Sequence, residues 1–133
     1  MTSTDSAFAA LGDERFLSLT TFRKSGERVS TPVWIGRDGD ALIVTTPQAS
    51  GKVKRLRNSP RVEVRPCNRM GRVKDGVEPV ASVAEVLTDE GIRERLTGII
   101  RRKYWLEYWM VMGIERLIKS GQENRVILRI TPA

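Results

Sequence analysis

Short β-type segments separated by tight turns leave this chain few ways to fold. Residues 16–22, 28–37 and 41–46 are rich in aromatic and β-branched side chains, and apolar and polar residues alternate in the second segment. The intervening residues 24–27 (Lys-Ser-Gly-Glu) and 38–40 (Asp-Gly-Asp) are typical of turns that join antiparallel neighbours. The first three strands are therefore predicted to form a meander.

The rest of the chain predicts three more strands, with helices around them. Pro32 cannot donate a hydrogen bond within a sheet, so the second strand should lie at an edge or contain a bulge. The remaining expected elements are a helix at 6–15, a short helix at 51–57, strands at 61–67, 80–87 and 125–130, a basic loop at 68–78, and a long helix from Thr88 or Asp89 that continues through 107–119. This order predicts a mainly β (α+β) fold, a six-stranded antiparallel barrel with flanking helices, in a single domain spanning residues 1–133.

The residue types that are missing exclude several kinds of chemistry. The chain has no histidine and one cysteine, which excludes Ser-His-Asp and Cys-His nucleophiles, histidine metal sites and an intrachain disulfide. We expect a cytoplasmic protein without a signal peptide or integral membrane segment, because the N-terminus lacks a basic region and no apolar run approaches the roughly 18 residues of a spanning helix. Redox or group-transfer chemistry would have to come from a bound cofactor.

Positive charge is concentrated in one part of the chain. Of the net charge of +7, residues 50–74 carry the whole excess, with nine Lys or Arg side chains against the single acid Glu63. A basic field of this kind attracts anions. Nucleic acid, a membrane surface and a phosphorylated small molecule are the candidate partners.

The junction TTPQASGKVKRLR, residues 45–57, holds the most informative group of residues. A strand that ends in Thr45 and Thr46 is followed by Ser50 as a helix N-cap, and Gly51 then leaves the backbone open to a close approach. The free N–H groups of a first helical turn bind anions, and basic side chains add charge-assisted hydrogen bonds to phosphate; here these are Lys52, Lys54 and Arg55. The segment is not a Walker A motif. The same spacing also fits a solvated basic helix capped by a serine, and spacing alone does not decide between the two.

Two other features each allow more than one interpretation. Cys67 is either a small packed hydrophobic residue or a thiol whose pKa is lowered by basic neighbours. Residues 104–112 (YWLEYWMVM) predict a helix in the core or in a dimer interface, a substrate wall, or a membrane-surface anchor beside the basic residues 101–103.

The whole chain resembles the pyridoxamine-phosphate-oxidase-like superfamily of small flavoproteins, and within it the flavin/deazaflavin oxidoreductases that include F420-dependent enzymes. The segments that carry the resemblance are FLSLTTFRKSGERVSTPVWIGRDGDALIVTT, SGKVKRLRNSPRVEV, RRKY and RVILRITP. The resemblance implies an FMN-binding type of split barrel and a homodimer with two cofactor sites at its interface.

The resemblance also implies which residues bind the cofactor. It places the ring system along two strands and the cofactor phosphate at the helix start, with further phosphate or tail contacts from neighbouring cations and Arg61 and Arg65 as weaker candidates. The implied ring residues are Pro32, Val33, Trp34, Thr45 and Thr46, the implied phosphate residues are Ser50, Gly51 and Lys52, and the additional contacts are Lys54 and Arg55. No metal site is expected, and no catalytic side chain is assigned; Tyr104, Tyr108 or a water could donate a proton.

The resemblance implies an oxidoreductase that binds coenzyme F420 and passes hydride from the reduced deazaflavin to a small organic acceptor. FMN is the alternative cofactor. FMN-using relatives often carry an arginine at the head of the second strand and an Arg-Lys pair at the helix start, where this chain has Ser30 or Thr31 and Gly51-Lys52. The surplus of basic residues near Lys52 suits a longer and more acidic tail.

Two further functions belong to other classes. A heme-binding or cofactor-carrier protein of the same fold is disfavoured by the absence of histidine, although Tyr or Cys can ligate heme iron. A nucleic-acid-binding protein would use the basic segment on phosphates, but that segment has no interleaved aromatic residues for base stacking.

Overall fold

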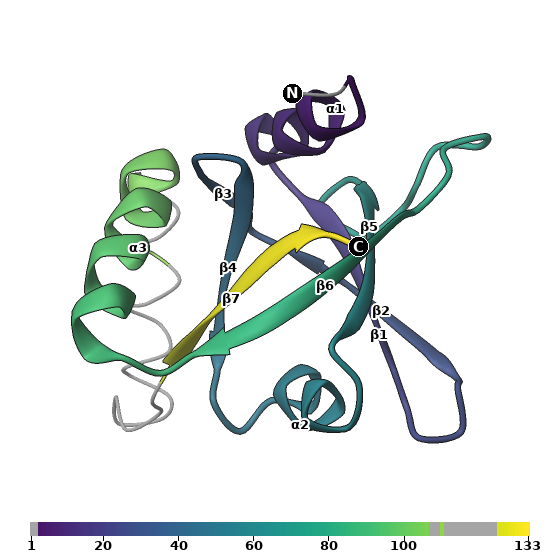
Figure 1. Ribbon diagram of the computed structural model, residues 1–133. Coiled ribbons are helices and arrows are strands. Elements are labelled where there is room, and N and C mark those ends of the chain that lie inside the picture. Colours follow the sequence, from purple (N-terminus) through teal and green to yellow (C-terminus); the bar gives the residue numbers. More distant parts are fainter. Residues whose placement is uncertain (1–2, 107–109, 111–124) are drawn as a thin grey trace.

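The computed structural model describes residues 3–106, 110 and 125–133, and for residues 3–6 it describes the backbone alone. The elements in chain order are α1 (Ser3–Ala10), a 3₁₀ helix η1 (Leu11–Asp13), β1 (Leu17–Phe22), β2 (Arg28–Val33), β3 (Gly36–Asp38), β4 (Ala41–Pro47), α2 (Gly51–Asn58), β5 (Arg61–Pro66), β6 (Val80–Leu87), α3 (Glu90–Lys103) and β7 (Arg125–Pro132) (Figure 1). The helix expected at 6–15 instead begins earlier and ends in the 3₁₀ turn. The helix expected at 107–119 lies outside the described residues.

All strands belong to one antiparallel sheet in the order β2-β1-β5-β6-β7-β4-β3. Strands β2 and β3 lie at opposite ends of this order, yet only Trp34 and Ile35 separate them in the chain. The two edges of the sheet must therefore lie close together, so the sheet curls into a split barrel (Figure 1). The predicted fold class is confirmed, with seven strands instead of six because the strand expected at 28–37 is divided.

The strand is divided at Ile35, which is hydrogen-bonded by the last residue of α3 and by the residue that follows it. The backbone N–H of Ile35 donates to the Tyr104 hydroxyl at 3.1 Å, and the Ile35 carbonyl accepts from that hydroxyl and from Lys103 Nζ at 3.0 and 2.8 Å. Because these side chains satisfy the Ile35 backbone, it needs no neighbouring strand. The chain can then leave β1 at one edge of the sheet and join β4 at the other.

Turn and edge predictions from the sequence hold in the structure. Gly26 and Gly39 have φ of 91° and 62° in the β1–β2 and β3–β4 turns, which suits glycine because side chains are strained there. Pro32 lies in β2, which pairs with β1 alone and is an edge strand. Helix α3 begins after Asp89, whose carboxylate accepts from the Ile92 N–H at 2.9 Å.

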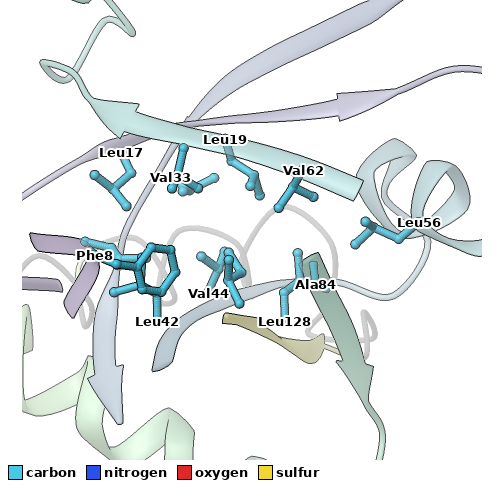
Figure 2. Close-up of a cluster of buried hydrophobic side chains, with 13 residues drawn as sticks. Phe8, Leu17, Leu19, Val33, Leu42, Val44, Leu56, Val62, Ala84 and Leu128 are labelled. Atoms are coloured by element: carbon cyan, nitrogen blue, oxygen red, sulfur yellow. The ribbon is translucent and has the colours of Figure 1, made fainter. Parts of the chain in front are cut away.

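The interior of the curled sheet holds the main hydrophobic core. Figure 2 shows side chains from the β1, β2 and β5 side of the barrel facing those from β4, β6 and β7, with Phe8 of α1 at one end and Leu56 of α2 at the other. Strands β4 and β7 are also covered on their outer face. There Ile43 and Ile127 pack against Leu96, Ile100 and Tyr104 from α3 and the residue that follows it. Alternate residues of these two strands thus enter two different apolar clusters.

No helix in the described ranges is long and apolar enough to span a bilayer.

Candidate functional site

A cavity of about 340 Å³ opens where several strand ends meet the start of α2. Six of the ten residues predicted to bind a cofactor line it. They are Pro32, Val33, Trp34, Thr45, Thr46 and Lys52. The first three come from the end of β2 and the residue after it, the two threonines come from β4, and Lys52 comes from the first turn of α2. Elements predicted separately from the sequence are therefore brought to one site.

The start of α2 is held in place by a short chain of side-chain hydrogen bonds. The Ser50 hydroxyl caps the helix by accepting from the Val53 N–H, as predicted. It also accepts from the Thr46 hydroxyl at 3.2 Å, which ties the helix start to β4. Ser50 itself does not line the cavity; its contribution there is to position Lys52.

The other predicted cations of this segment lie outside the cavity. Lys54 is exposed on α2. Arg55 donates from Nε to the Thr21 hydroxyl at 2.6 Å, and its guanidinium lies so close to Gly51 that an added Cβ would be 2.8 Å from Nη1. Gly51 thus faces the Arg55 side chain.

The two weaker candidates, Arg61 and Arg65, have contacts elsewhere. The Arg61 guanidinium lies 3.9 Å from the centre of the Phe22 ring, a cation–π contact. Arg65 donates to the Val77 carbonyl at 3.2 Å. Neither residue lines the cavity.

Positive charge dominates the described wall of the cavity. Burial, and after it the nearby cations Arg55 and Arg125, lower the pKa of Lys52. Arg125 lines the cavity from the start of β7 and donates to Thr45, from Nε to the hydroxyl and from Nη2 to the carbonyl, both at 3.2 Å. No carboxylate is found among the described lining residues. Neighbouring cations repel one another, and a bound anion offsets this repulsion. The arrangement therefore suits a phosphate or a carboxylate.

Four lining residues were not predicted from the sequence. They are Phe16, Pro47, Arg69 and Arg125. Pro47 could have been found because it continues the Thr45-Thr46 strand end. Arg125 could not, because its place beside Thr45 depends on the pairing of β4 with β7, which sets Pro47 opposite Arg125.

Trp34 is supported from behind by the aromatic ring of Tyr104. The two rings stack with centroids 4.9 Å apart and an interplanar angle of 9°. The Tyr104 hydroxyl is within 2.8 Å of the Arg15 carbonyl in addition to its contacts with Ile35. Tyr104 is 1% exposed and does not line the cavity. The structure therefore gives this side chain a positioning role, while Tyr108, the other candidate proton donor, lies outside the described residues.

The surroundings of Cys67 do not favour a reactive thiol, and the described residues offer no metal site. Partial burial raises the pKa of the Cys67 thiol, so the electrostatic environment does not activate it as a thiolate. Within the described residues no group of three or more Asp, Glu or Cys side chains could hold a metal ion, and the whole chain lacks histidine.

Comparisons with known proteins agree with the fold. The family model described as pyridoxamine 5′-phosphate oxidase matches residues 3–133. No curated protein sequence matches the chain significantly.

Several solved structures share the fold. An F420 reductase is 16% identical with a TM-score of 0.61, covering 95% of this chain and 93% of that one. An FAD-binding protein from Mesorhizobium loti is 18% identical with a TM-score of 0.60, covering 99% and 88%. The heme storage protein HutZ from Vibrio cholerae is 14% identical with a TM-score of 0.63, covering 96% and 87%. At these identities the likeness is one of fold.

Proposed function

The chain belongs to the pyridoxamine 5′-phosphate oxidase family, and from that premise we propose that it is an oxidoreductase that uses coenzyme F420. The observation that carries the proposal is the group of cations at the cavity, with Lys52 and Arg125 in its wall and Arg55 close to Lys52. A phosphorylated cofactor with an apolar ring fits a cavity that combines these cations with Trp34 and Val33.

The residues of the chain divide the work of binding between them. Lys52 and Arg125 supply charge and N–H donors to the phosphate. Trp34 and Val33 provide an apolar wall for the ring, and the Tyr104 ring behind Trp34 fixes the indole plane. A reduced deazaflavin, when bound, supplies hydride to an organic acceptor. The role of the protein is then to orient the two molecules and exclude water between them.

Two observations favour the deazaflavin coenzyme over FMN. The position matched to the strand arginine of FMN-using relatives is Ser30 or Thr31, and neither provides a cation. Arg28, the first residue of β2, pairs with Glu63 at 3.3 Å and does not line the cavity. The Arg55 guanidinium lies against Gly51 and near Lys52 but outside the cavity, so it provides positive charge beyond the cavity wall. A long acidic tail can use that charge, whereas FMN ends at one phosphate. FMN is the second candidate because the fold is shared with a flavin-binding protein.

We also propose that the working unit is a homodimer. Three apolar side chains near the end of α3 are more than half exposed, namely Trp105 at 63%, Leu106 at 57% and Met110 at 62%. Burying them against a second copy would remove apolar area from water, and two-fold dimers are the commonest soluble oligomers. Light scattering that returns the mass of a single chain at micromolar concentration would contradict this proposal.

Calorimetric titration of the purified protein with F420, FMN, heme and a short DNA duplex tests the function directly. The matched ligand is the phosphate-free deazaflavin, which has the same ring but no phosphate or tail. The matched variants are Lys52→Ala, in the cavity wall, and Lys54→Ala, which removes the same charge from the exposed face of the same helix. Losing a charge-assisted hydrogen bond of about 1.5–3 kcal/mol weakens binding by roughly 10–150-fold.

The expected result is tight F420 binding that Lys52→Ala weakens and Lys54→Ala does not, with no effect of either variant on the phosphate-free compound. If F420 binds equally to wild type and Lys52→Ala, the phosphate site is wrong. If only FMN binds, the second candidate replaces the first. Binding of heme alone, or salt-sensitive binding of DNA alone, overturns the oxidoreductase proposal.

A further inference from the structure

A second and larger cavity adjoins the proposed cofactor site. Its volume is about 710 Å³, and it shares Phe16, Trp34 and Arg69 with the smaller cavity. The indole of Trp34 thus borders both cavities. A molecule in the larger cavity would lie next to a cofactor bound in the smaller one.

The larger cavity combines positive charge with apolar surface. Its described lining includes two guanidinium groups, Arg15 and Arg69, and no carboxylate. Cys67 adds no negative charge near neutral pH, because partial burial raises the pKa of its thiol. Phe16, Trp34 and Met110 supply the apolar part of the wall. Such a lining favours a flat apolar molecule that carries a negative charge.

Arg69 is held in place by a compact turn. The Asn68 side-chain oxygen accepts from the backbone N–H groups of Met70 and Arg72, both at 2.9 Å, and the Gly71 N–H donates to the Asn68 carbonyl at 2.9 Å. Gly71 has φ of 86°, and a Cβ there would lie 3.4 Å from Cδ of Pro32. The turn therefore lies against β2, at a residue that lines the smaller cavity. These contacts order the backbone on either side of Arg69, whose exposed side chain lines both cavities.

Arg15, the other arginine of the lining, contacts the buried ring behind Trp34. Its guanidinium carbon lies 4.8 Å from the centre of the Tyr104 ring, which also stacks on Trp34. The Arg15 guanidinium and the Trp34 indole, which both line the larger cavity, thus contact the same buried Tyr104 ring. Both arginine side chains are exposed and line the larger cavity.

We propose that the larger cavity is the acceptor site and that its acceptor is a flat, apolar organic anion, a carboxylate held by Arg15 and Arg69 with its ring against Trp34 and Phe16. The identification of this ligand as an acceptor rests on the proposed function. The preference of the cavity for an aromatic anion does not depend on the proposed function, because it follows from the lining residues alone.

A matched pair of probes tests the preference: 2-naphthoate and 2-naphthalenemethanol, which differ mainly in the carboxylate. Both are titrated calorimetrically into wild type, Arg69→Gln and Arg15→Gln. The control variants are Arg57→Gln, which removes an exposed charge from α2, and Lys52→Ala, which alters the smaller cavity. Thermal unfolding of each variant confirms that it is folded. F420 and FMN are titrated into the same samples in the presence and absence of 2-naphthoate.

The expected result is that wild type prefers the carboxylate by about tenfold or more, as one charge-assisted hydrogen bond provides. The preference is lost in Arg69→Gln and Arg15→Gln, and retained in Arg57→Gln and Lys52→Ala. Naphthoate and cofactor should bind together. Equal binding of the two probes overturns the proposal, and so does a preference that Lys52→Ala abolishes or that the cofactor displaces. If naphthoate binds as expected but neither cofactor binds, the proposed function fails and the anion site stands.

Discussion

Removing the Tyr104 hydroxyl should destabilise the protein without weakening cofactor binding. The hydroxyl accepts from the Ile35 N–H at 3.1 Å and lies 3.0 Å from the Ile35 carbonyl, at the point where the chain passes from β2 to β3. Ile35 is fully buried, so water cannot replace the lost partner. In Tyr104→Phe the ring stays on Trp34 while the Ile35 N–H loses its acceptor.

The size of the effect follows from that unsatisfied donor. Leaving one buried backbone group without a partner costs about 1–3 kcal/mol. The carbonyl of Ile35 is less affected, because Lys103 Nζ still donates to it at 2.8 Å. With an unfolding entropy of about 2.1 cal/mol/K per residue, each kcal/mol lowers the Tm of a chain this long by roughly 3–4 °C. The expected fall in Tm is therefore about 3–10 °C.

Urea unfolding followed by circular dichroism measures this loss of unfolding free energy. An unchanged slope of the unfolding free energy against urea concentration shows that the native and unfolded states are otherwise preserved. Lys103→Met, alone and combined with Tyr104→Phe, closes a double-mutant cycle. Both side chains donate to the Ile35 carbonyl, although the single Tyr104 hydroxyl proton is shared with the Arg15 carbonyl at 2.8 Å. The double variant should therefore lose more than the sum of the single losses. A Tyr104→Phe protein as stable as wild type, or strictly additive losses, would refute the reasoning.

Three further changes have defined outcomes. Ser50→Ala removes the cap of α2 and should lower the unfolding free energy by about 1 kcal/mol in urea. Gly71→Ala places a side chain at φ of 86° and close to Pro32, so it should lower the unfolding free energy by about 1–3 kcal/mol and weaken the preference for naphthoate. Unchanged naphthoate binding would show that the turn does not contribute to the anion site. Burial raises the pKa of Cys67, so iodoacetamide should modify it more slowly in the native protein than in urea near pH 8, and the native rate should rise with pH; equal rates would contradict the buried environment.

The sequence predicts the features of the fold that depend on a few neighbouring residues. Turn glycines, the Ser50 and Asp89 caps and the edge position of Pro32 each depend on a few consecutive residues. The six predicted cofactor-binding residues that line the cavity lie at or next to strand ends or in a first helical turn. Their common location, though not their ligand, could be inferred from short-range patterns and the family resemblance.

Contacts between distant segments were the part that could not be predicted. The strand expected at 28–37 is divided because Tyr104 and Lys103 bond to the Ile35 backbone from about 70 residues away. Arg125 reaches Thr45 across a separation of 80 residues. The sequence predicts one environment for the aromatic segment 104–112, yet Tyr104 is buried while Trp105 and Leu106 are exposed. Periodicity does not distinguish these environments, because each depends on what a neighbouring element supplies.

The charge of the cavity depends on the pairing of β4 with β7. Arg125 shares a face of β7 with Ile127, while the next residue, Leu128, points into the barrel core. A slip of one residue would turn the exposed Arg129 into the barrel core and move Arg125 to the other face, away from Thr45. The cost of burying Arg129 in the apolar core therefore fixes the register, and the register in turn places a cation beside Lys52. The basic segment that dominates the sequence supplies only part of the cavity's positive charge, and the hydrophobic core determines where the rest of it lies.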